Sequence, residues 1–194
     1  MEKSLLLIKP GFVNEQVYYS VLNEIRNFKD LTVYEVKLVK YDEASSQKHY
    51  ENKALTPFYK ELTDYLSSGV ALGIVLMGDN AIYRVNGLKH RLRDELPKKY
   101  NLKTDVMRNV LHASDSKEAS ELEIEVFETL PKIKESFVLL DKENKQISPL
   151  FLNKKEALKN LKNFDEACYV ALYNPMLKKF TQKEMVGEGQ CEAS

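Results

Sequence analysis

The sequence predicts an α/β sandwich, in which helices pack on a four-stranded sheet. Short apolar runs alternate with longer segments whose apolar residues recur at helical spacing. The elements follow one another as strand, helix, strand, helix, strand, helix, strand, helix, an order typical of layered α/β domains. Of the 194 residues, 43% are apolar and 30% are charged, so the chain can form both a core and a solvated surface. The pattern leaves open whether the strands are parallel or antiparallel.

Each element carries its own local signal. The first strand is a continuous apolar run that Lys9-Pro10-Gly11 closes as a turn. Asn14 can begin the first helix, and the alternation of the second strand slips once, which predicts a bulge. Gly78-Asp79-Asn80 stops the third strand, and Pro97 ends the helix that follows it. The predicted strands are 4–8, 31–39 and 70–77, with 106–112 as a short fourth strand or an extended segment. The predicted helices are 14–25, 42–50, 58–68, 81–96 and 116–127.

The chain changes character after Leu130-Pro131. A strand, a turn, a second strand, a Lys-rich helix and a last strand follow one another there. The expected strands are 136–140, 147–152 and 167–173, and the expected helix is capped by Asn153 and ends at Leu161. We therefore divide the chain into a domain of residues 1–133, a small ββαβ appendage of residues 134–180 and a disordered tail of residues 181–194.

Charge and cysteine content exclude several classes of function. Lys plus Arg and Asp plus Glu both total 29, so the zero net charge gives no support for bulk attraction to nucleic acid or membranes. Cys168 and Cys191 show neither metal-ligand spacing nor a disulfide framework. The apolar run at the start is too short for a secretion signal, and no run approaches membrane-spanning length. We expect a soluble cytoplasmic protein.

The sharpest candidate site surrounds His112. An apolar stretch delivers this histidine to a strand end, and Ala113, Ser114, Asp115 and a helix follow. Asp115 and Glu118 have the spacing of a capping box, which places the imidazole beside the unpaired N–H groups of a helix N-terminus. Such a position suits an incoming phosphate, and a neutral imidazole is a competent nucleophile. The alternatives without a catalytic role are that His112 is a half-buried packing residue and that the Ser-Asp-Ser segment is an ordinary helix cap.

Other candidate residues lie elsewhere along the chain. Glu123, on the helix after His112, could hold one ring nitrogen as N–H and leave the other free to attack. Lys9, at the end of the first strand, could present a cation to phosphates, although a solvated lysine is common there. Tyr50 and Phe58 could stack on a base, although pattern alone favours two core aromatics at least as well.

Several short motifs together resemble the nucleoside diphosphate kinase family, from about Lys3 to Phe127. The segment Arg108-Asn109-Val110-Leu111-His112-Ala113-Ser114-Asp115-Ser116 is similar to the family signature Asn-x-x-His-Gly-Ser-Asp-Ser, which is a specific match. Weaker matches occur in family order at Leu6-Leu7-Ile8-Lys9-Pro10, His49-Tyr50, Pro57-Phe58, Ser68-Gly69 and Gly78-Asp79-Asn80-Ala81.

The resemblance implies a ferredoxin-like sandwich with an antiparallel sheet. It also implies a ping-pong reaction, in which the γ-phosphoryl group of ATP or another nucleoside triphosphate passes to a histidine and then to a nucleoside diphosphate. Mg²⁺ would come bound to the nucleotide phosphates, with no metal ligand assigned in the protein. The resemblance implies that His112 is the nucleophile and that Glu123 and Ser114 orient it. Lys9 and Tyr50 would contact the phosphates or the histidine. Asn109 would contact the ribose, and Phe58 would stack on the base.

The segment from Asn86 to Asp105 departs most from the family. The family carries an arginine in this helix and then a loop whose residues clamp the nucleotide phosphates, whereas here Asn86 stands at the arginine position. The loop is shorter and reads as continued helix, from which we choose Arg93 as the phosphate-binding cation. Losing a bidentate arginine and its hydroxyl neighbour would cost a few kcal/mol of transition-state binding unless another group replaces them. Two smaller departures are Gly11-Phe12-Val13 after Lys9-Pro10, and Ala113 in place of glycine.

Two other functions stay open beside an active nucleoside diphosphate kinase. The altered segment and the appendage suit a non-catalytic nucleotide-binding or scaffolding module on the same fold. A phosphohistidine protein that exchanges phosphate with another protein would carry the same residues. The expected partners are nucleoside tri- and diphosphates and further copies of the chain, in at least a dimer, with no membrane and no sequence-specific nucleic acid.

Overall fold

The first sheet is four-stranded and antiparallel throughout. The structure is a computed structural model that describes residues 1–167, 169–177 and 179–186. The strand order β2-β3-β1-β4 places β1 between β3 and β4, which is the ferredoxin-like order. A register shift between Val33 and Glu35 confirms the bulge in the second strand. The strands are β1 (Glu2–Ile8), β2 (Leu31–Lys40), β3 (Val70–Gly78) and β4 (Leu111–Ala113).

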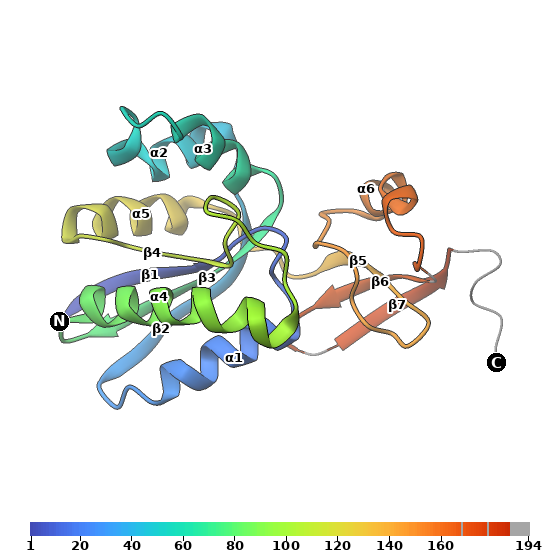
Figure 1. The fold of residues 1–194 in the computed structure, drawn as a ribbon, viewed down its shortest axis with the longest axis horizontal. Helices are drawn as coiled ribbons and strands as arrows, with labels where there is room; N and C mark the ends of the chain where they lie inside the picture. The colour runs from blue at the N-terminus through green and yellow to red at the C-terminus, as the bar shows by residue number, and fades with distance from the viewer. Residues whose placement is uncertain (168, 178, 187–194) are drawn as a thin grey trace.

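Helices cover both faces of this sheet (Figure 1). Alternate residues of β1 separate the two cores, because Leu6 and Ile8 pack with α1 and α4 whereas Leu5 and Leu7 pack with α3 and α5. The helices are α1 (Glu15–Arg26), α2 (Glu43–His49), α3 (Tyr59–Ser67), α4 (Ala81–Tyr100) and α5 (Lys117–Thr129), with a 3-10 turn η1 (Glu51–Lys53) after α2. The α/β sandwich predicted from the sequence is confirmed.

Polar side chains cap α1, α2 and α5, though not always where the sequence suggests. The Asn14 side chain accepts a hydrogen bond from the Val17 N–H at 2.9 Å, as expected of an N-cap. The predicted capping box of Asp115 and Glu118 is wrong. Ser116 caps α5 instead, accepting from the Ala119 N–H at 3.1 Å, and this leaves the Asp115 carboxylate free for other partners.

Two predicted boundaries around the fourth strand are also wrong. Pro97 lies inside α4 rather than ending it, because burial of Leu96 and a 2.6 Å hydrogen bond between the hydroxyls of Tyr100 and Ser20 hold the last turn. The strand expected over 106–112 begins only at Leu111. The Asp105 side chain accepts backbone N–H groups from the next residues, so the segment before β4 is a turn.

The C-terminal part forms a second antiparallel sheet in the order β5-β6-β7. Its elements are β5 (Ser136–Leu140), α6 (Lys154–Lys159), a 3-10 turn η2 (Leu161–Asn163), β6 (Tyr169–Asn174) and β7 (Lys179–Met185). The part is therefore βαββ, which corrects the predicted ββαβ.

The two strand errors have different causes. Residues 147–152 pair with β5 only through isolated bridges. The Leu139 N–H donates to the Ser148 hydroxyl instead of to a backbone carbonyl, and Pro149 has no N–H to donate. The predicted disordered tail is wrong over 181–185, since β7 extends the sheet there by pairing with β6. Residues 187–194 of that predicted tail lie outside the described residues.

The two sheets share buried contacts. Val138, Leu140 and Tyr173 of the second part belong to the same core as α1 of the first. The Gln146 side chain donates to the Val13 carbonyl at 3.1 Å, and the Tyr19 hydroxyl donates to the Met176 carbonyl at 3.0 Å. These contacts join the two parts without an intervening linker.

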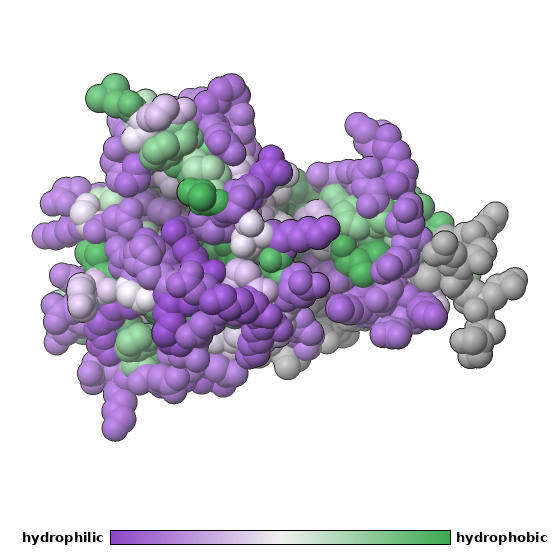
Figure 2. Space-filling model, in the orientation of Figure 1, coloured by the Kyte–Doolittle hydropathy of each residue, from purple (hydrophilic) through white to green (hydrophobic). Residues whose placement is uncertain are grey.

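The surface differs between the two parts. The helices of the first sheet present mostly hydrophilic side chains in Figure 2, whereas hydrophobic side chains show on the second part beside α6. Among the described residues, no helix has both the length and the apolar content needed to cross a membrane.

Candidate functional site

His112 is fixed by the backbone on both sides. It is the middle residue of β4, paired with Leu7 of the central strand, and the Ser114 N–H donates to the Leu5 carbonyl at 3.2 Å. Arg93 of α4 donates from Nε to the Leu111 carbonyl at 2.9 Å, so a charged side chain also holds the strand. The His112 residue is 7% exposed. A nucleophile held this way has little freedom to turn away from a substrate.

A buried carboxylate stands against one nitrogen of the ring. His112 Nε2 lies 3.0 Å from Glu123 Oε2, although the N–H direction of Nε2 does not point at that oxygen. The Ser114 hydroxyl donates to the same Oε2 at 2.7 Å. Burial would raise the pKa of Glu123, but His112 and the Ser114 hydrogen bond lower it below its ordinary value. The carboxylate is therefore charged, and Nδ1 is the ring nitrogen left for a substrate.

Aromatic rings pack around His112 from the α2 side. Its ring centroid lies 5.0 Å from that of His49 and 5.4 Å from that of Tyr50, both edge to face. His49 is fully buried, and burial lowers its pKa to about 3, so this imidazole is neutral. Burial also raises the pKa of Tyr50, which keeps its phenol protonated. We call His112, Glu123, Ser114, His49 and Tyr50 the His112 cluster.

Three buried or half-buried cations, Lys9, Lys89 and Arg93, converge beside this cluster. The Lys9 N–H donates to the Val110 carbonyl at 3.0 Å, two residues before His112, and its Nζ donates to the Met107 carbonyl at 3.2 Å. Burial, and then the charges of Arg93 and Lys89, lower the pKa of Lys9 to about 7. Mutual repulsion among fixed cations favours an incoming anion.

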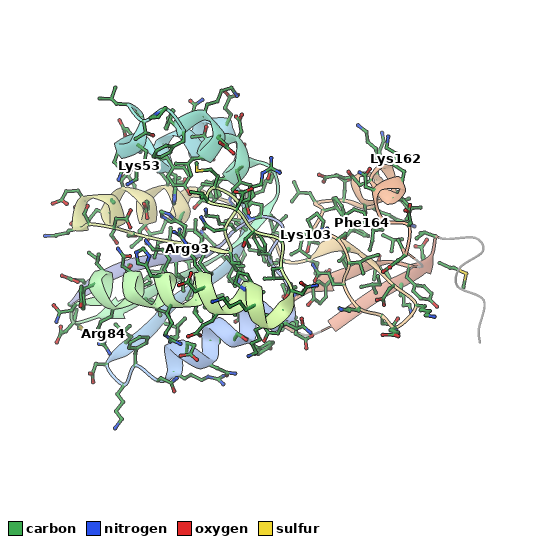
Figure 3. The ribbon with its side chains drawn as sticks, viewed as in Figure 1. Lys53, Arg84, Arg93, Lys103, Lys162 and Phe164 are labelled. Carbon is green, nitrogen blue, oxygen red and sulfur yellow. The ribbon has the colours of Figure 1, made fainter. Side chains whose placement is uncertain are left out.

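The Asp115 carboxylate contacts polar side chains from α4 and from the connection between α2 and α3. Lys89 Nζ lies 2.9 Å from Asp115 Oδ1, Asn86 Nδ2 lies 3.2 Å from the same oxygen, and Lys53 Nζ lies 3.4 Å from Oδ2. Figure 3 shows Arg93 on α4 and Lys53 on the connection between α2 and α3, with α5 between them. Burial would raise the pKa of Asp115, but Lys89 lowers it.

Sequence reasoning missed Lys89 as a site residue. The signal was available, because Lys89 stands four residues before Arg93 and therefore on the same face of the helix. Lys89 is 4% exposed, and a lysine so deeply buried is rare without a partner.

Phe58 and Asn109, the two predicted nucleoside contacts, lie apart from the His112 cluster. Phe58 is 42% exposed at the start of α3. The Asn109 amide donates to the Val106 carbonyl at 2.8 Å, within the loop before β4. A hollow of about 620 Å³ lies between α3 and this loop, where its lining includes Pro57, Tyr65 and Arg108. A second, of about 780 Å³, borders Asn86 and Asp115; the lining of neither hollow includes His112 itself.

Comparison with known proteins connects this geometry to one family. A family model described as nucleoside diphosphate kinase matches residues 2–130. The chain belongs to the nucleoside diphosphate kinase family. The nucleoside diphosphate kinase of Methanobrevibacter smithii is 31% identical over 131 residues, which is 66% of this chain and 87% of that protein. That of Methanococcoides burtonii is 31% identical over 129 residues, covering 64% of this chain and 85% of that protein.

Solved structures of nucleoside diphosphate kinases have the same fold. The Aquifex aeolicus enzyme aligns with a TM-score of 0.51 and 26% identity, over 65% of this chain and 94% of its own. The Encephalitozoon cuniculi enzyme aligns with a TM-score of 0.51 and 24% identity, over 66% of this chain and 88% of its own. The resemblance inferred from short motifs is thus confirmed as family membership, and the second sheet lies beyond the region matched by the family model.

Within the nucleoside diphosphate kinase family, the changed helix of this chain now has a structural explanation. Asn86, where the resemblance leads us to expect an arginine, contacts Asp115 as a neutral amide. Lys89, one turn further along α4, brings a positive charge to the same carboxylate. Lys89 therefore places a positive charge beside the carboxylate that Asn86 contacts.

Proposed function

We propose that this chain is a nucleoside diphosphate kinase that works through a phosphohistidine at His112. The observation that carries the proposal is the contact of His112 Nε2 with the charged Glu123, 3.0 Å away, beside three converging cations. A histidine held in one orientation next to an anion-binding group suits attack on a phosphoryl group. The active kinase is favoured over a phosphate-exchanging protein because the family relatives carry the kinase name.

In the first half-reaction, the lone pair of His112 Nδ1 attacks the γ-phosphorus of a nucleoside triphosphate. The bond from the γ-phosphorus to the bridging oxygen breaks, and the nucleoside diphosphate leaves with that oxygen. The proton on Nε2 stays on the ring, where Glu123 stabilises the positive charge that the ring gains. In the second half-reaction, a terminal oxygen of a second diphosphate attacks the phosphohistidine, and the neutral imidazole returns.

The cations and Tyr50 act on the transferred group. Lys9, Lys89 and Arg93 offset the negative charge of the phosphates, and their positions are set by the fold before the nucleotide arrives. Tyr50 keeps its proton and so can donate a hydrogen bond. We assign Ser114 to the orientation of Glu123 rather than of His112, because its hydroxyl donates to that carboxylate at 2.7 Å.

Mg²⁺ fits this reaction as a partner of the nucleotide rather than of the protein. Mg²⁺ prefers oxygen ligands in octahedral geometry, and when bound it offsets charge on the phosphates. Among the described residues, the grouped metal-ligand candidates include two imidazoles, and Asp115 is already engaged by Lys89 and Lys53. The protein's part is therefore to orient the phosphates that hold the ion.

The remaining assignments extend the proposal. Phe58 would stack on the base and Asn109 would contact the ribose, so any common nucleoside triphosphate could serve. We place the reaction in residues 1–133 and treat residues 134–180 as an appendage to that domain. Assembly into at least a dimer and a cytoplasmic location stay predictions.

The test is phosphoryl transfer observed in two steps. Purified protein is incubated with γ-³²P-labelled ATP and Mg²⁺, beside His112→Ala, and then chased with unlabelled diphosphate. We expect an acid-labile label on the wild type alone, which the chase transfers to the diphosphate. Absence of label with nucleotide still bound would instead support a nucleotide-binding module, the alternative that Asn86 at the arginine position favours.

A further inference from the structure

Unpartnered polar atoms gather behind His112, on the side away from the proposed substrate position. Both ring nitrogens of His49 are buried without a hydrogen-bond partner, and so is Nε2 of His112. The hydroxyl of Tyr41, whose ring centroid lies 5.2 Å from that of His49, also lacks one. Buried polar groups are normally satisfied, so these atoms require partners that the described side chains do not supply.

Two of these groups, His49 and His112, have the arrangement of a metal site together with Glu123. One ligand atom each from His49, His112 and Glu123 can be chosen so that all lie within 4.8 Å of one another. A tetrahedral zinc ion separates its ligand atoms by roughly 3.4 Å. The His112 and Glu123 atoms are already 3.0 Å apart, and a His49 ring nitrogen lies within 4.8 Å of both. The Ser114 hydroxyl bonded to Glu123 supplies the outer support that metal ligands usually have.

We propose that His49, His112 and Glu123 form an inhibitory site for a divalent transition-metal ion of the zinc class. Two imidazoles and one carboxylate suit Zn²⁺ or Co²⁺, whereas Mg²⁺ prefers an all-oxygen set. The nearby positive charge of Lys9 opposes any further cation, and only an ion that bonds strongly to nitrogen overcomes this repulsion.

Inhibition follows from the tautomer of His112, and this step rests on the proposed function. A neutral imidazole has one N–H. When Nε2 gives its lone pair to the metal, the proton must move to Nδ1, which is the nitrogen required for attack on the phosphoryl group. Glu123 is also withdrawn from its orienting role. The metal-bound protein therefore cannot form the phosphohistidine.

The metal is measured first, without nucleotide. The full chain is dialysed against Zn²⁺ in excess Mg²⁺, and Co²⁺ is used to record the visible spectrum. We expect one tightly bound ion per chain with a tetrahedral Co²⁺ spectrum. His49→Gln should weaken binding by more than about 100-fold, since loss of an outer-shell partner alone costs about 10–100-fold. His90→Gln, at the exposed histidine of α4, is the matched control and should bind as the wild type does.

A second measurement needs no variant. In wild-type protein labelled with ¹⁵N-histidine, Zn²⁺ should move the ring signals of His49 and His112 and leave those of His90 in place. Absence of tight binding, or equal binding by His49→Gln, overturns the site. If the label of the ³²P assay forms normally in the presence of bound Zn²⁺, the inhibitory role is overturned. Because metal uptake and the ring signals are measured without nucleotide, failure of the proposed kinase activity would not disguise the result for the metal site.

Discussion

At the scale of single residues, the pairing of His112 with Glu123 explains why the site needs a buried carboxylate. Glu123 is 2% exposed, yet its neighbours keep it charged. A carboxylate of this kind fixes the tautomer and the orientation of the imidazole, and both are lost when it becomes an amide.

Glu123→Gln should therefore slow phosphohistidine formation by roughly 10²–10⁴-fold, the range for residues that position or assist a catalytic imidazole. Glu121→Gln, on the exposed face of the same helix, should change it little. Single-turnover labelling with γ-³²P-ATP measures both. Equal rates in the two variants would show that Glu123 does not orient His112.

The charge of Lys9 should depend on bound nucleotide. Its pKa of about 7 means that the amine is partly or mostly neutral above neutral pH, because burial, Arg93 and Lys89 all disfavour its charge. Bound phosphates favour the charged form and raise this pKa. Between about pH 7 and pH 10 nucleotide binding should therefore take up a proton, since the free protein lacks it and the complex holds it.

Titration calorimetry in buffers of different ionisation enthalpy measures this proton uptake. The uptake should rise above pH 7 in the wild type and disappear in Lys9→Met. Uptake of the same size in Lys9→Met would mean that another group titrates.

At the scale of elements, we infer that α4 supplies its phosphate-binding charge from Lys89, one helical turn beyond Asn86. Lys89→Ala should lower kcat/KM for nucleotide by about 10- to 100-fold, the value of one or two charge-assisted hydrogen bonds. Adding Asn86→Arg should recover part of the loss, because it returns a cation beside Asp115. Lys98→Ala, exposed near the end of the same helix, is the control. If adding Asn86→Arg to Lys89→Ala did not raise kcat/KM, the inferred exchange of roles between positions 86 and 89 would be contradicted.

Two glycines in different elements should respond in opposite directions to the same substitution. A Cβ at Gly73 of β3 would lie 2.2 Å from the Phe127 ring, so Gly73→Ala should destabilise the protein by about 1–3 kcal/mol. A Cβ at Gly87 of α4 meets nothing within 4 Å, so Gly87→Ala should stabilise it by about 0.5–1 kcal/mol. Urea unfolding measures both free energies, and a loss of stability in Gly87→Ala would refute the second expectation.

Much of the element order could be predicted because periodicity and turn residues are local signals. The errors arose where tertiary contacts override such signals. Pro97 stays helical because Leu96 and Tyr100 are held by packing, and the segment from 147 to 152 fails as a strand because Ser148 and Pro149 interrupt its pairing.

The site residues that belong to a sequence motif could be predicted, whereas those that join the site only through the fold could not. His112, Glu123 and Ser114 come together as expected, although Ser114 bonds to Glu123 rather than to the histidine. Lys89 escaped notice because its burial cannot be read from a charged helical sequence. The contact of His49 with His112 likewise depends on how α2 lies against β4.

At the scale of the whole molecule, the two sheets should unfold together. Leu140 of β5 is fully buried in the core shared with α1, so Leu140→Ala should lower the free energy of unfolding by about 2–5 kcal/mol. Thermal unfolding of the wild type and the variant should each give one transition in calorimetry and circular dichroism. Two separate transitions in the wild type would show that the appendage folds on its own.

The bridge between Ile133 and Leu38 has a mechanical consequence. The Ile133 N–H donates to the Leu38 carbonyl at 2.9 Å, just after the chain leaves α5. A force applied to the C-terminal sheet would therefore reach the outer strand β2 at this bond before it could pull on α5. Because α5 carries Glu123, we expect this hydrogen bond to reduce the force that reaches His112 when the C-terminal sheet is pulled.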